Sequence, residues 1–280
     1  MQHVAILGAG ELGGALAHIA ARRGTARSVT LIDDAGRVAE GKALDIAQAA
    51  PVERFATHIA GTTDLSAAAG AAVVVLADRA SGLEWQGDEA VQLLKQIGRS
   101  LAGAVAICAG AQQRDVVERA VLDLKMSRVR VFGTAPEALA SAARAIVALA
   151  LNGSPQEISL ALLGVPPHHI VIPWEDATAG GLALTRLVDE PTRRRLSARI
   201  AALWPPGPHT LAAAAWLALE AMAGRSRRMS SAFVAPDATA GLRARTSALP
   251  VRIGRSGIVE VIAPRLTAVE RVAFDNATLL

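Results

Sequence analysis

The stretch Val4-Ala5-Ile6-Leu7-Gly8-Ala9-Gly10-Glu11-Leu12-Gly13 decides the fold of this chain. Its first four residues are apolar, which predicts a strand buried on both faces, and the glycines follow directly. From Leu12 to Arg23 the apolar spacing is helical, and Gly24 ends the pattern. The next run, 28–32, is rich in β-branched and apolar residues and predicts a second strand. Together these segments indicate one parallel βαβ unit.

Each glycine of this loop has a separate part in binding a dinucleotide. Gly8 permits a tight turn, Gly10 lets the backbone approach a pyrophosphate, and Gly13 lets the helix pack closely on the strand. The N-terminus of the helix then presents free N–H groups to the phosphates. We expect the cofactor to be bound by Gly8, Gly10, Glu11, Leu12, Gly13, Asp33, Asp34, Ala77 and Ala109.

The carboxylate of Asp33 favours NAD over NADP. Asp33 ends the second predicted strand, about 20 residues beyond Gly13, where a carboxylate accepts hydrogen bonds from ribose hydroxyls and repels a 2′-phosphate. The alternative is a Rossmann-like domain that has lost its nucleotide. Glu11 places a second carboxylate in the phosphate loop, and it opposes anion binding unless its side chain points away.

The alternation of strands and helices continues and predicts an α/β fold. We expect a doubly wound parallel Rossmann sheet in an NAD-binding domain, 1–134, followed by a smaller mixed α+β substrate domain, 135–280. The further strands expected are 57–61, 72–77, 104–109, 129–133, 158–163, 169–172, 229–234, 249–253 and 258–262. The further helices expected are 41–50, 65–70, 88–100, 115–124, 137–151, 191–203 and 210–224.

Composition excludes several other classes of protein. The chain has 280 residues, of which 52% are hydrophobic and 19% charged, the balance of a globular protein. The net charge of +4 is mild, and the arginines at 193–195 and 225–228 are interpreted as solvated helix faces, so we expect no nucleic-acid partner. No apolar run has the length of a membrane span and no signal peptide is apparent. The lone Cys108 lies in an apolar run and is expected to be a buried thiol of a cytoplasmic protein.

Several motifs of the first sixty-five residues resemble those of the lactate/malate dehydrogenase family. They are Gly8–Gly13, Leu31-Ile32-Asp33, the stretch Gly41-Lys42-Ala43-Leu44-Asp45-Ile46, and Gly61-Thr62-Thr63-Asp64. The resemblance implies an NAD domain followed by a substrate domain, assembled as a homodimer or homotetramer. It also implies hydride transfer between NAD and a 2-hydroxy or 2-keto acid. In that chemistry a His exchanges the proton, an Asp orients the His, and Arg side chains bind the carboxylate.

The family's substrate-binding positions carry other residue types in this sequence. Its mobile loop, with an Arg at each end, corresponds to 81–87, where neither end is Arg. Its Asn-Pro pair after the fifth strand falls at 109–111 and is absent. The Asp and Arg of its D-x-x-R motif correspond to Leu139 and Ala142. We therefore expect no ordinary turnover of malate or lactate.

The position of the family's catalytic His is also changed. The corresponding run is Leu163-Gly164-Val165-Pro166-Pro167-His168-His169, in which Pro166 or Pro167 takes the place of the His. His168 is shifted by one or two residues, and a shift of one residue in a strand reverses the direction of the side chain. His168, His169 and His209 stay candidates for an acid–base group, and for each the alternative is a surface or structural role.

Three hypotheses about function follow. The first is a noncatalytic NAD-binding relative that acts as a cofactor-responsive binding or regulatory protein, a pseudoenzyme. The second is an oxidoreductase that acts on a less charged or larger substrate with another acid–base group. The third is a structural subunit of a larger complex. The expected partners are a dinucleotide and an unknown small molecule, and no metal site is expected because His168-His169 is the only close His pair.

Overall fold

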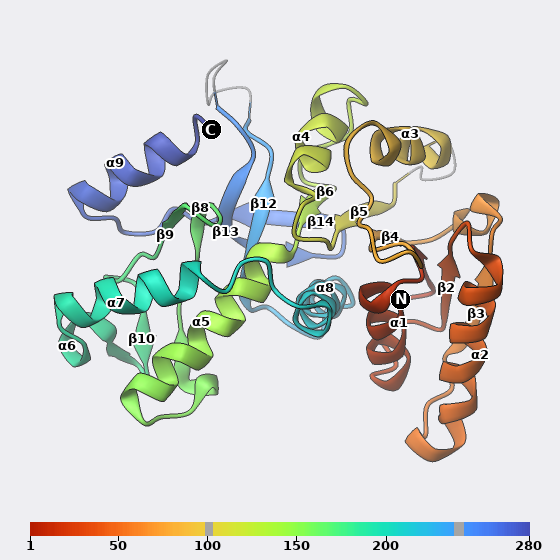
Figure 1. Cartoon of the computed structure of the whole chain (residues 1–280), viewed down its shortest axis with the longest axis horizontal. Helices are drawn as coiled ribbons and strands as arrows, with labels where there is room; N and C mark the ends of the chain where they lie inside the picture. Colours follow the sequence, from red (N-terminus) through yellow and green to blue (C-terminus); the bar gives the residue numbers. More distant parts are fainter. Residues whose placement is uncertain (99–102, 238–243) are drawn as a thin grey trace.

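One large sheet runs through the computed structural model, which describes residues 1–98, 103–237 and 244–280 (Figure 1). Its strand order is β3-β2-β1-β4-β5-β6-β12-β13-β8-β9, and β14 pairs with β13 off this path. The first six strands in this order pair in parallel. These strands are β1 (His3–Leu7), β2 (Ser28–Ile32), β3 (His58–Thr62), β4 (Val73–Leu76), β5 (Val105–Cys108) and β6 (Val131–Gly133).

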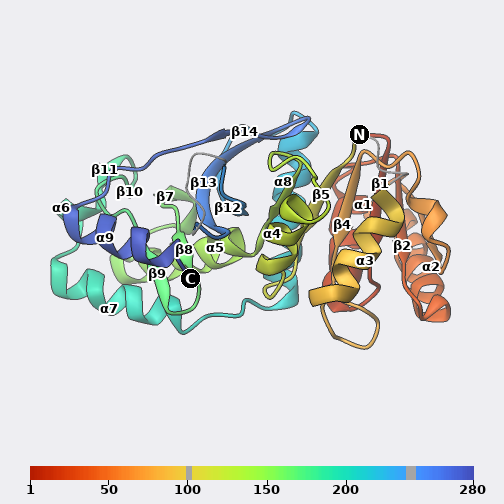
Figure 2. The same ribbon diagram turned by 90° about the horizontal axis from the view of Figure 1, so that it is seen from above.

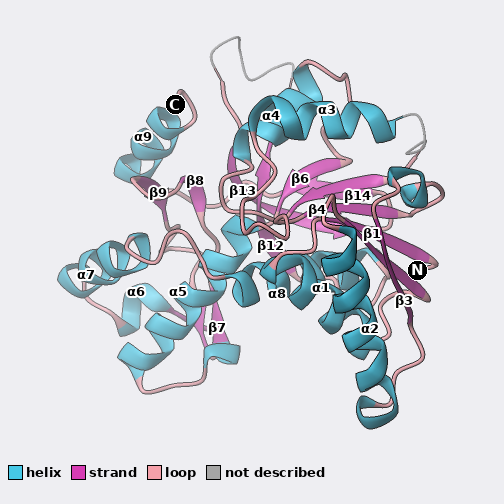
Figure 3. Ribbon diagram, turned by 45° about the vertical axis from the view of Figure 1, so that its right-hand side comes forward, coloured by secondary structure: helices cyan, strands magenta, loops and turns pink. Residues whose placement is uncertain are grey.

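Helices cover both faces of this parallel part. Figure 3 shows α3 and α4 on one face, with α1, α2 and α8 on the other. These helices are α1 (Glu11–Arg22), α2 (Gly36–Glu53), α3 (Gly87–Gly98), α4 (Arg114–Leu122) and α8 (Pro208–Met222), and a 3₁₀ turn spans Leu65–Ala68. The expected doubly wound α/β fold is thereby confirmed. The last two residues of the helix predicted at 88–100 lie outside the described residues.

Burial on both faces explains why the central strands are short, continuous apolar runs. All four residues of β4 and all four of β5 are buried. Cys108 closes β5 with no exposed surface, and burial raises the pKa of its thiol to about 12. The prediction of a buried strand thiol is confirmed.

The second half of the chain extends the same sheet with antiparallel strands. β12 pairs with β6 and β13, and β13 pairs with β8 and β14. The antiparallel strands are β12 (Met229–Val234), β13 (Ser247–Gly254), β14 (Gly257–Val261), β8 (Leu163–Val165) and β9 (His169–Val171). The helices beside them are α5 (Ala135–Leu151), α6 (Leu184–Leu187), α7 (Glu190–Ala201) and α9 (Ala268–Ala277), with a 3₁₀ turn at Pro155–Glu157.

Helix α8 links the two halves of the molecule. It lies between the N-terminal helices and the C-terminal elements (Figure 2) and contacts both α1 and α5. Its apolar residues Leu211, Leu219 and Met222 belong to the same hydrophobic core as β1 and β4. A second core gathers side chains of α5 and α7. The division of the chain at residue 134 stays a prediction.

Parts of the sequence prediction differ from the structure. The run at 158–163 forms no single strand, because β7 (Ile158–Ser159) joins β10 (Thr178–Ala179) and β11 (Leu182–Ala183) in a separate small sheet, whereas β8 begins at Leu163. Helix α9 was also not predicted; its only buried residue is Ala277. Within the described residues, no helix is both long and apolar enough to cross a bilayer.

Candidate functional site

The candidate site is a crevice where the strand order of the sheet reverses. β1 lies between β2 and β4. The chain passes from β1 to β2 on one side, and from β4 to β5 on the opposite side. Ligands of open α/β sheets bind at such a point, outside the carboxyl ends of the strands. A cavity of about 460 Å³ opens there, which we call the β1–β4 crevice. Its lining residues are Gly10, Glu11, Leu12, Lys42, Asp78, Ala80, Ser81, Gly82, Glu84, Gln112, Pro205, Pro206, Pro208 and Leu211.

The glycine loop has the tight geometry that the sequence predicts. Gly8 has a φ of +118°, a region that residues with a side chain rarely adopt. A Cβ at Gly13 would lie 2.1 Å from the carbonyl oxygen of Gly8, so only glycine permits this approach of α1 to β1. A Cβ at Gly10 would lie 2.3 Å from the carboxyl group of Asp78. The group that lies against Gly10 is therefore a side chain of the protein itself.

Asp78, which follows β4 by two residues, binds the N-terminus of α1. Its Oδ2 accepts a hydrogen bond from the N–H of Leu12 at 3.1 Å, and its Oδ1 accepts one from Gly13 at 2.9 Å. Its backbone oxygen accepts the N–H of Gly10 at 2.9 Å. Only 7% of Asp78 is exposed. The positive end of the α1 dipole is thus already compensated by a buried carboxylate.

Asp33 is bound in a similar way. Its Oδ2 accepts the N–H of Ala9 at 2.8 Å and of Ala80 at 2.9 Å, and its Oδ1 accepts that of Ala35 at 2.9 Å. Asp33 is 4% exposed. Because its carboxylate binds both Ala9 and Ala80, it joins the glycine loop to the segment after β4. The neighbouring Asp34 is exposed and lines a smaller cavity of about 160 Å³ beside Trp85.

A third carboxylate, that of Glu84 in the segment between β4 and α3, binds the loop after β5. It accepts the N–H groups of Ala111 at 2.9 Å and Gln112 at 2.8 Å. Asp78 and Glu84 also form an isolated antiparallel β-bridge, which closes the segment between them into a short hairpin. Burial raises the pKa of Glu84, and the nearby charge of Asp78 acts in the same direction. Neither residue was predicted as a site residue, although Asp78 stands directly at the carboxyl edge of a predicted strand.

The β1–β4 crevice is acidic. Three carboxylates line it, those of Glu11, Asp78 and Glu84, but only one cation, Lys42. The Nζ of Lys42 donates to the carbonyl oxygen of Gly10 at 2.6 Å. Its lining residues all belong to the described part of the chain and include neither a histidine nor an arginine. An anionic ligand would therefore enter a crevice in which carboxylates outnumber cations.

The other predicted cofactor residues lie in the sheet. Ala77 and Ala109 are fully buried, and their N–H groups donate to Leu7 and Leu76. Their backbones thus continue the ladder of β1, β4 and β5. Side chains at these two positions do not reach the crevice surface.

The predicted acid–base candidates lie outside the crevice. His168 and His169 are exposed, the first directly before β9 and the second as its first residue. His209 is exposed at the start of α8 and lines an adjoining groove of about 490 Å³, which also contains His18 and shares Glu11 and Lys42 with the crevice. No group of three or more His, Cys, Asp or Glu side chains within the described residues could hold a metal ion.

A buried ion pair stands beside the positions of the D-x-x-R motif. Leu139 is fully buried in the second core, and Ala142 is half-buried. Glu137 and Arg144 pair with each other on the same helix, and Glu137 Oε2 accepts the N–H of Ser231 at 2.8 Å. Burial raises the pKa of Glu137, and the charge of Arg144 opposes this rise. Both charged side chains therefore make their contacts within the protein, between α5 and β12.

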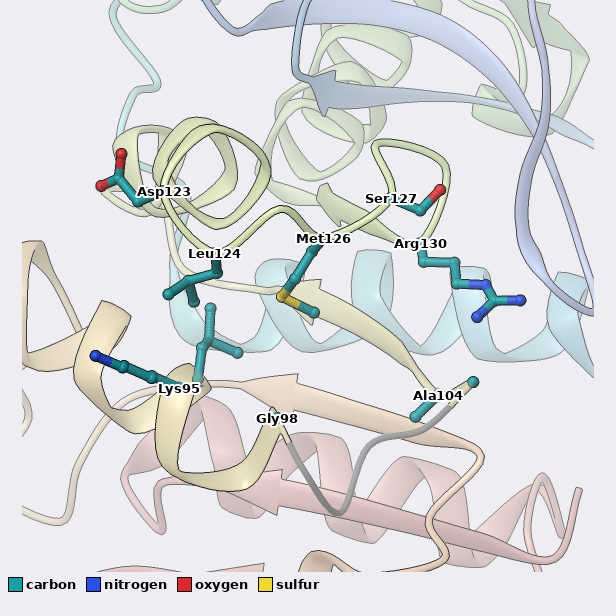
Figure 4. Close-up of a pocket in the computed structure, with 10 residues that line it drawn as sticks. Lys95, Gly98, Ala104, Asp123, Leu124, Met126, Ser127 and Arg130 are labelled. Carbon is teal, nitrogen blue, oxygen red and sulfur yellow. The ribbon is translucent and has the colours of Figure 1, made fainter.

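A further cavity of about 520 Å³ lies at the opposite edge of the sheet (Figure 4). It is lined by Ala104 and Arg130, which precede β5 and β6, and by residues of α3 and the end of α4. In Figure 4 the side chains of Lys95 and Arg130 extend in different directions. This cavity is remote from the strand ends at which the order of the sheet reverses.

The arrangement does not fit a dinucleotide as it stands. The loop has the shape of a pyrophosphate cradle, yet a carboxylate lies against Gly10 and binds the N–H groups of Leu12 and Gly13. The cavity beside Asp34, at about 160 Å³, is below the roughly 300–1,000 Å³ typical of small-molecule pockets. The closed loop therefore has to change before a pyrophosphate contacts it.

Comparisons with known proteins agree with the fold and the glycine loop. Residues 2–101 match the model of the lactate/malate dehydrogenase NAD-binding domain, which confirms NAD as the expected dinucleotide. The chain is 30% identical over 293 aligned positions to a malate dehydrogenase of Desulforudis audaxviator, covering 98% of this chain and 94% of that protein. It is 28% identical to a malate dehydrogenase of Thioalkalivibrio sulfidiphilus, with 99% and 96% covered.

Solved structures share the whole fold. The malate dehydrogenase of Aeropyrum pernix superposes with a TM-score of 0.87 at 20% identity, over 98% of this chain and 95% of that one. The lactate dehydrogenase of Cryptosporidium parvum, in complex with lactic acid and nicotinamide adenine dinucleotide, gives a TM-score of 0.85 at 19% identity, over 99% and 94%. The likeness therefore extends through both halves of the chain.

Proposed function

The chain belongs to the lactate/malate dehydrogenase family, and on this premise we propose that it is a noncatalytic, dinucleotide-binding member of that family. One observation carries the proposal. The β1–β4 crevice is lined by the carboxylates of Glu11, Asp78 and Glu84, without a histidine or an arginine among its lining residues. The crevice therefore offers neither a proton-exchanging imidazole nor a guanidinium for the carboxylate of a 2-hydroxy acid.

The chain's own groups act against a carboxylate substrate. An incoming 2-keto acid meets like charges at Asp78 and Glu84, while the cation of Lys42 is held by Gly10. A bound NAD supplies a hydride acceptor, but polarisation of the substrate carbonyl has to come from the protein. Because proton transfer by a positioned group contributes about 10²- to 10⁴-fold, its loss alone makes turnover slow.

The preference for NAD over NADP is part of the proposal. The buried carboxylate of Asp33 stands at the end of β2 and opposes a 2′-phosphate there. Gly8, Gly10, Glu11, Leu12 and Gly13 would surround the pyrophosphate in an opened loop. We also propose a homodimer or homotetramer in the cytoplasm, a location supported by the lone buried thiol of Cys108.

A turnover assay tests this function. The purified chain is incubated with NAD and malate or lactate, and with NADH and the two corresponding 2-keto acids. The Desulforudis audaxviator malate dehydrogenase is the positive control. We expect rates equal to those without enzyme. Saturable turnover would contradict the proposal.

The same assay addresses an oxidoreductase with altered chemistry. The acidic crevice favours an uncharged substrate over a carboxylate, so neutral ketones and aldehydes are included with NADH. If a neutral substrate is reduced, His168→Ala and His209→Ala decide whether either candidate histidine takes part. Both side chains are exposed, so these variants are expected to fold.

A further inference from the structure

We infer that Asp78 is an internal ligand of the dinucleotide site: its carboxylate occupies the position of the pyrophosphate and holds the site closed. A dinucleotide then binds only when this side chain moves away. The inference rests on the proposed function, because it concerns the same glycine loop. It adds a regulatory contact that the chain makes with itself.

The backbone donors of the loop carry this inference, because nearly all of them already have acceptors. The N–H of Gly10 donates to the backbone oxygen of Asp78. The N–H groups of Leu12 and Gly13 donate to its carboxylate oxygens Oδ2 and Oδ1. Two of the other three donors of the loop are also bound: Gly8 donates to the oxygen of Ile32 at 2.7 Å, and Ala9 donates to Asp33 at 2.8 Å. A pyrophosphate that approaches the start of α1 meets N–H groups whose hydrogen bonds are in use.

Competition between the two anions follows from their chemistry. A carboxylate and a phosphate both seek backbone N–H groups at a helix N-terminus, and one N–H does not serve both at full strength. The Asp78 carboxyl carbon would also lie 2.3 Å from a Cβ at Gly10, so it fills the space that this glycine leaves open. Being part of the same chain, Asp78 is present at a high effective concentration.

The segment that carries Asp78 has its own attachments. Ala80 donates to Asp33, Arg79 donates through its backbone to Leu83 at 2.8 Å, and Asp78 bridges to Glu84. The guanidinium of Arg79 lies 3.9 Å above the ring of Trp85. The attachments hold the hairpin in place, so rotation of the Asp78 side chain alone would free Leu12 and Gly13.

Titration calorimetry with three probes tests the inference on the full-length chain. NADH, inorganic pyrophosphate and adenosine are each titrated into the wild type and into Asp78→Ala. We expect the variant to bind NADH and pyrophosphate about ten- to a hundredfold more tightly, since two charge-assisted hydrogen bonds become free. Adenosine, which has no phosphate, is expected to bind both proteins equally.

Two further variants make the result specific. Asp275→Ala removes the same charge from an exposed site on α9, which does not line the β1–β4 crevice, and is expected to leave all three affinities unchanged. Asp78→Asn keeps the size of the side chain but has one acceptor oxygen, so an intermediate affinity is expected. Circular dichroism verifies that each variant is folded, and Asp78→Asn replaces Asp78→Ala as the test if the latter is not.

Equal affinity of the wild type and the folded Asp78 variants for pyrophosphate would overturn the inference. So would an equal gain with adenosine, or an equal gain from Asp275→Ala, because neither depends on freed N–H groups. These results differ from a failure of the proposed function. That function fails if the wild type turns over malate or lactate, whatever Asp78 does.

Discussion

The carboxylate of Asp78 lies 2.9 Å from the backbone nitrogen of Gly13, a residue 65 positions earlier in the chain. The contact joins the end of β4 to the start of α1 and compensates the positive end of that helix. It gives the glycine loop a structural partner that is part of the fold. Stability and ligand binding therefore depend on the same side chain.

Asp78→Ala is expected to lower the free energy of unfolding by about 1–3 kcal/mol, because two buried N–H groups lose their acceptor. Urea unfolding measures this loss. Added pyrophosphate is expected to raise the melting temperature of the variant by more than that of the wild type. A variant as stable as the wild type would show that the contact does not contribute to the free energy of unfolding.

Gly13 and its neighbour Gly14 form a matched pair for the packing of α1. A Cβ at Gly13 would lie 2.1 Å from the backbone oxygen of Gly8, whereas one at Gly14 would meet only the flexible side chain of Lys42, at 3.3 Å. Gly13→Ala is expected to destabilise the protein by about 1–3 kcal/mol or more. Gly14→Ala is expected to be neutral or stabilising by up to about 1 kcal/mol, since alanine favours a helix. Thermal unfolding of the two variants checks the difference, and equal melting temperatures would contradict the geometry of the loop.

The raised pKa of Glu84 gives the stability of the protein a pH dependence. Burial is the main cause, and the charge of Asp78 adds to it. A carboxyl whose pKa is higher in the folded than in the unfolded protein binds more protons when folded. Its contribution to the free energy of unfolding therefore decreases as pH rises between the two pKa values.

Unfolding of the wild type and of Glu84→Gln over a range of acidic pH isolates this effect. As pH falls through the raised pKa, the wild type is expected to gain stability relative to the variant. The gain is expected to stop below the ordinary pKa of a glutamate. A relative stability that rises with pH would mean that the Glu84 pKa is lowered.

Arg144 is expected to matter far more for stability than an arginine in an exposed ion pair. It pairs with Glu137 between α5 and β12, where both side chains are buried. Arg144→Met leaves that carboxylate buried without its cation, at an expected cost of about 3–5 kcal/mol. Arg194→Met, in the exposed pair with Glu190, is the control and is expected to change stability by less than about 1 kcal/mol. Similar costs for the two variants, measured by urea unfolding, would contradict the buried pair.

The parallel half of the fold could be predicted from sequence because its signals are local. The runs that form β4 and β5 are apolar along their whole length, β1 is apolar from Val4 onward, and the glycine loop follows β1 directly. Such patterns depend on neighbouring residues only. The helix α9 was not predicted, although Thr267 and Glu270 form a capping box that marks its start.

The internal partners of the site could not be predicted in the same way. Asp78, Glu84 and Glu137 each bind backbone groups that are far away in sequence, and the sheet topology decides which groups those are. Asp33 shows the same limit. Its position in the sequence predicts a contact with a ribose, whereas in the structure its carboxylate accepts hydrogen bonds from three backbone N–H groups.

The amide resonances of Leu12 and Gly13 test the central claim most directly, because these two groups are the donors that Asp78 holds. In heteronuclear NMR spectra of the wild type, titrated with pyrophosphate, both amides are expected to stay unshifted at concentrations that shift them in Asp78→Ala. If both amides shift equally in the two proteins, Asp78 does not occupy the anion position of the loop.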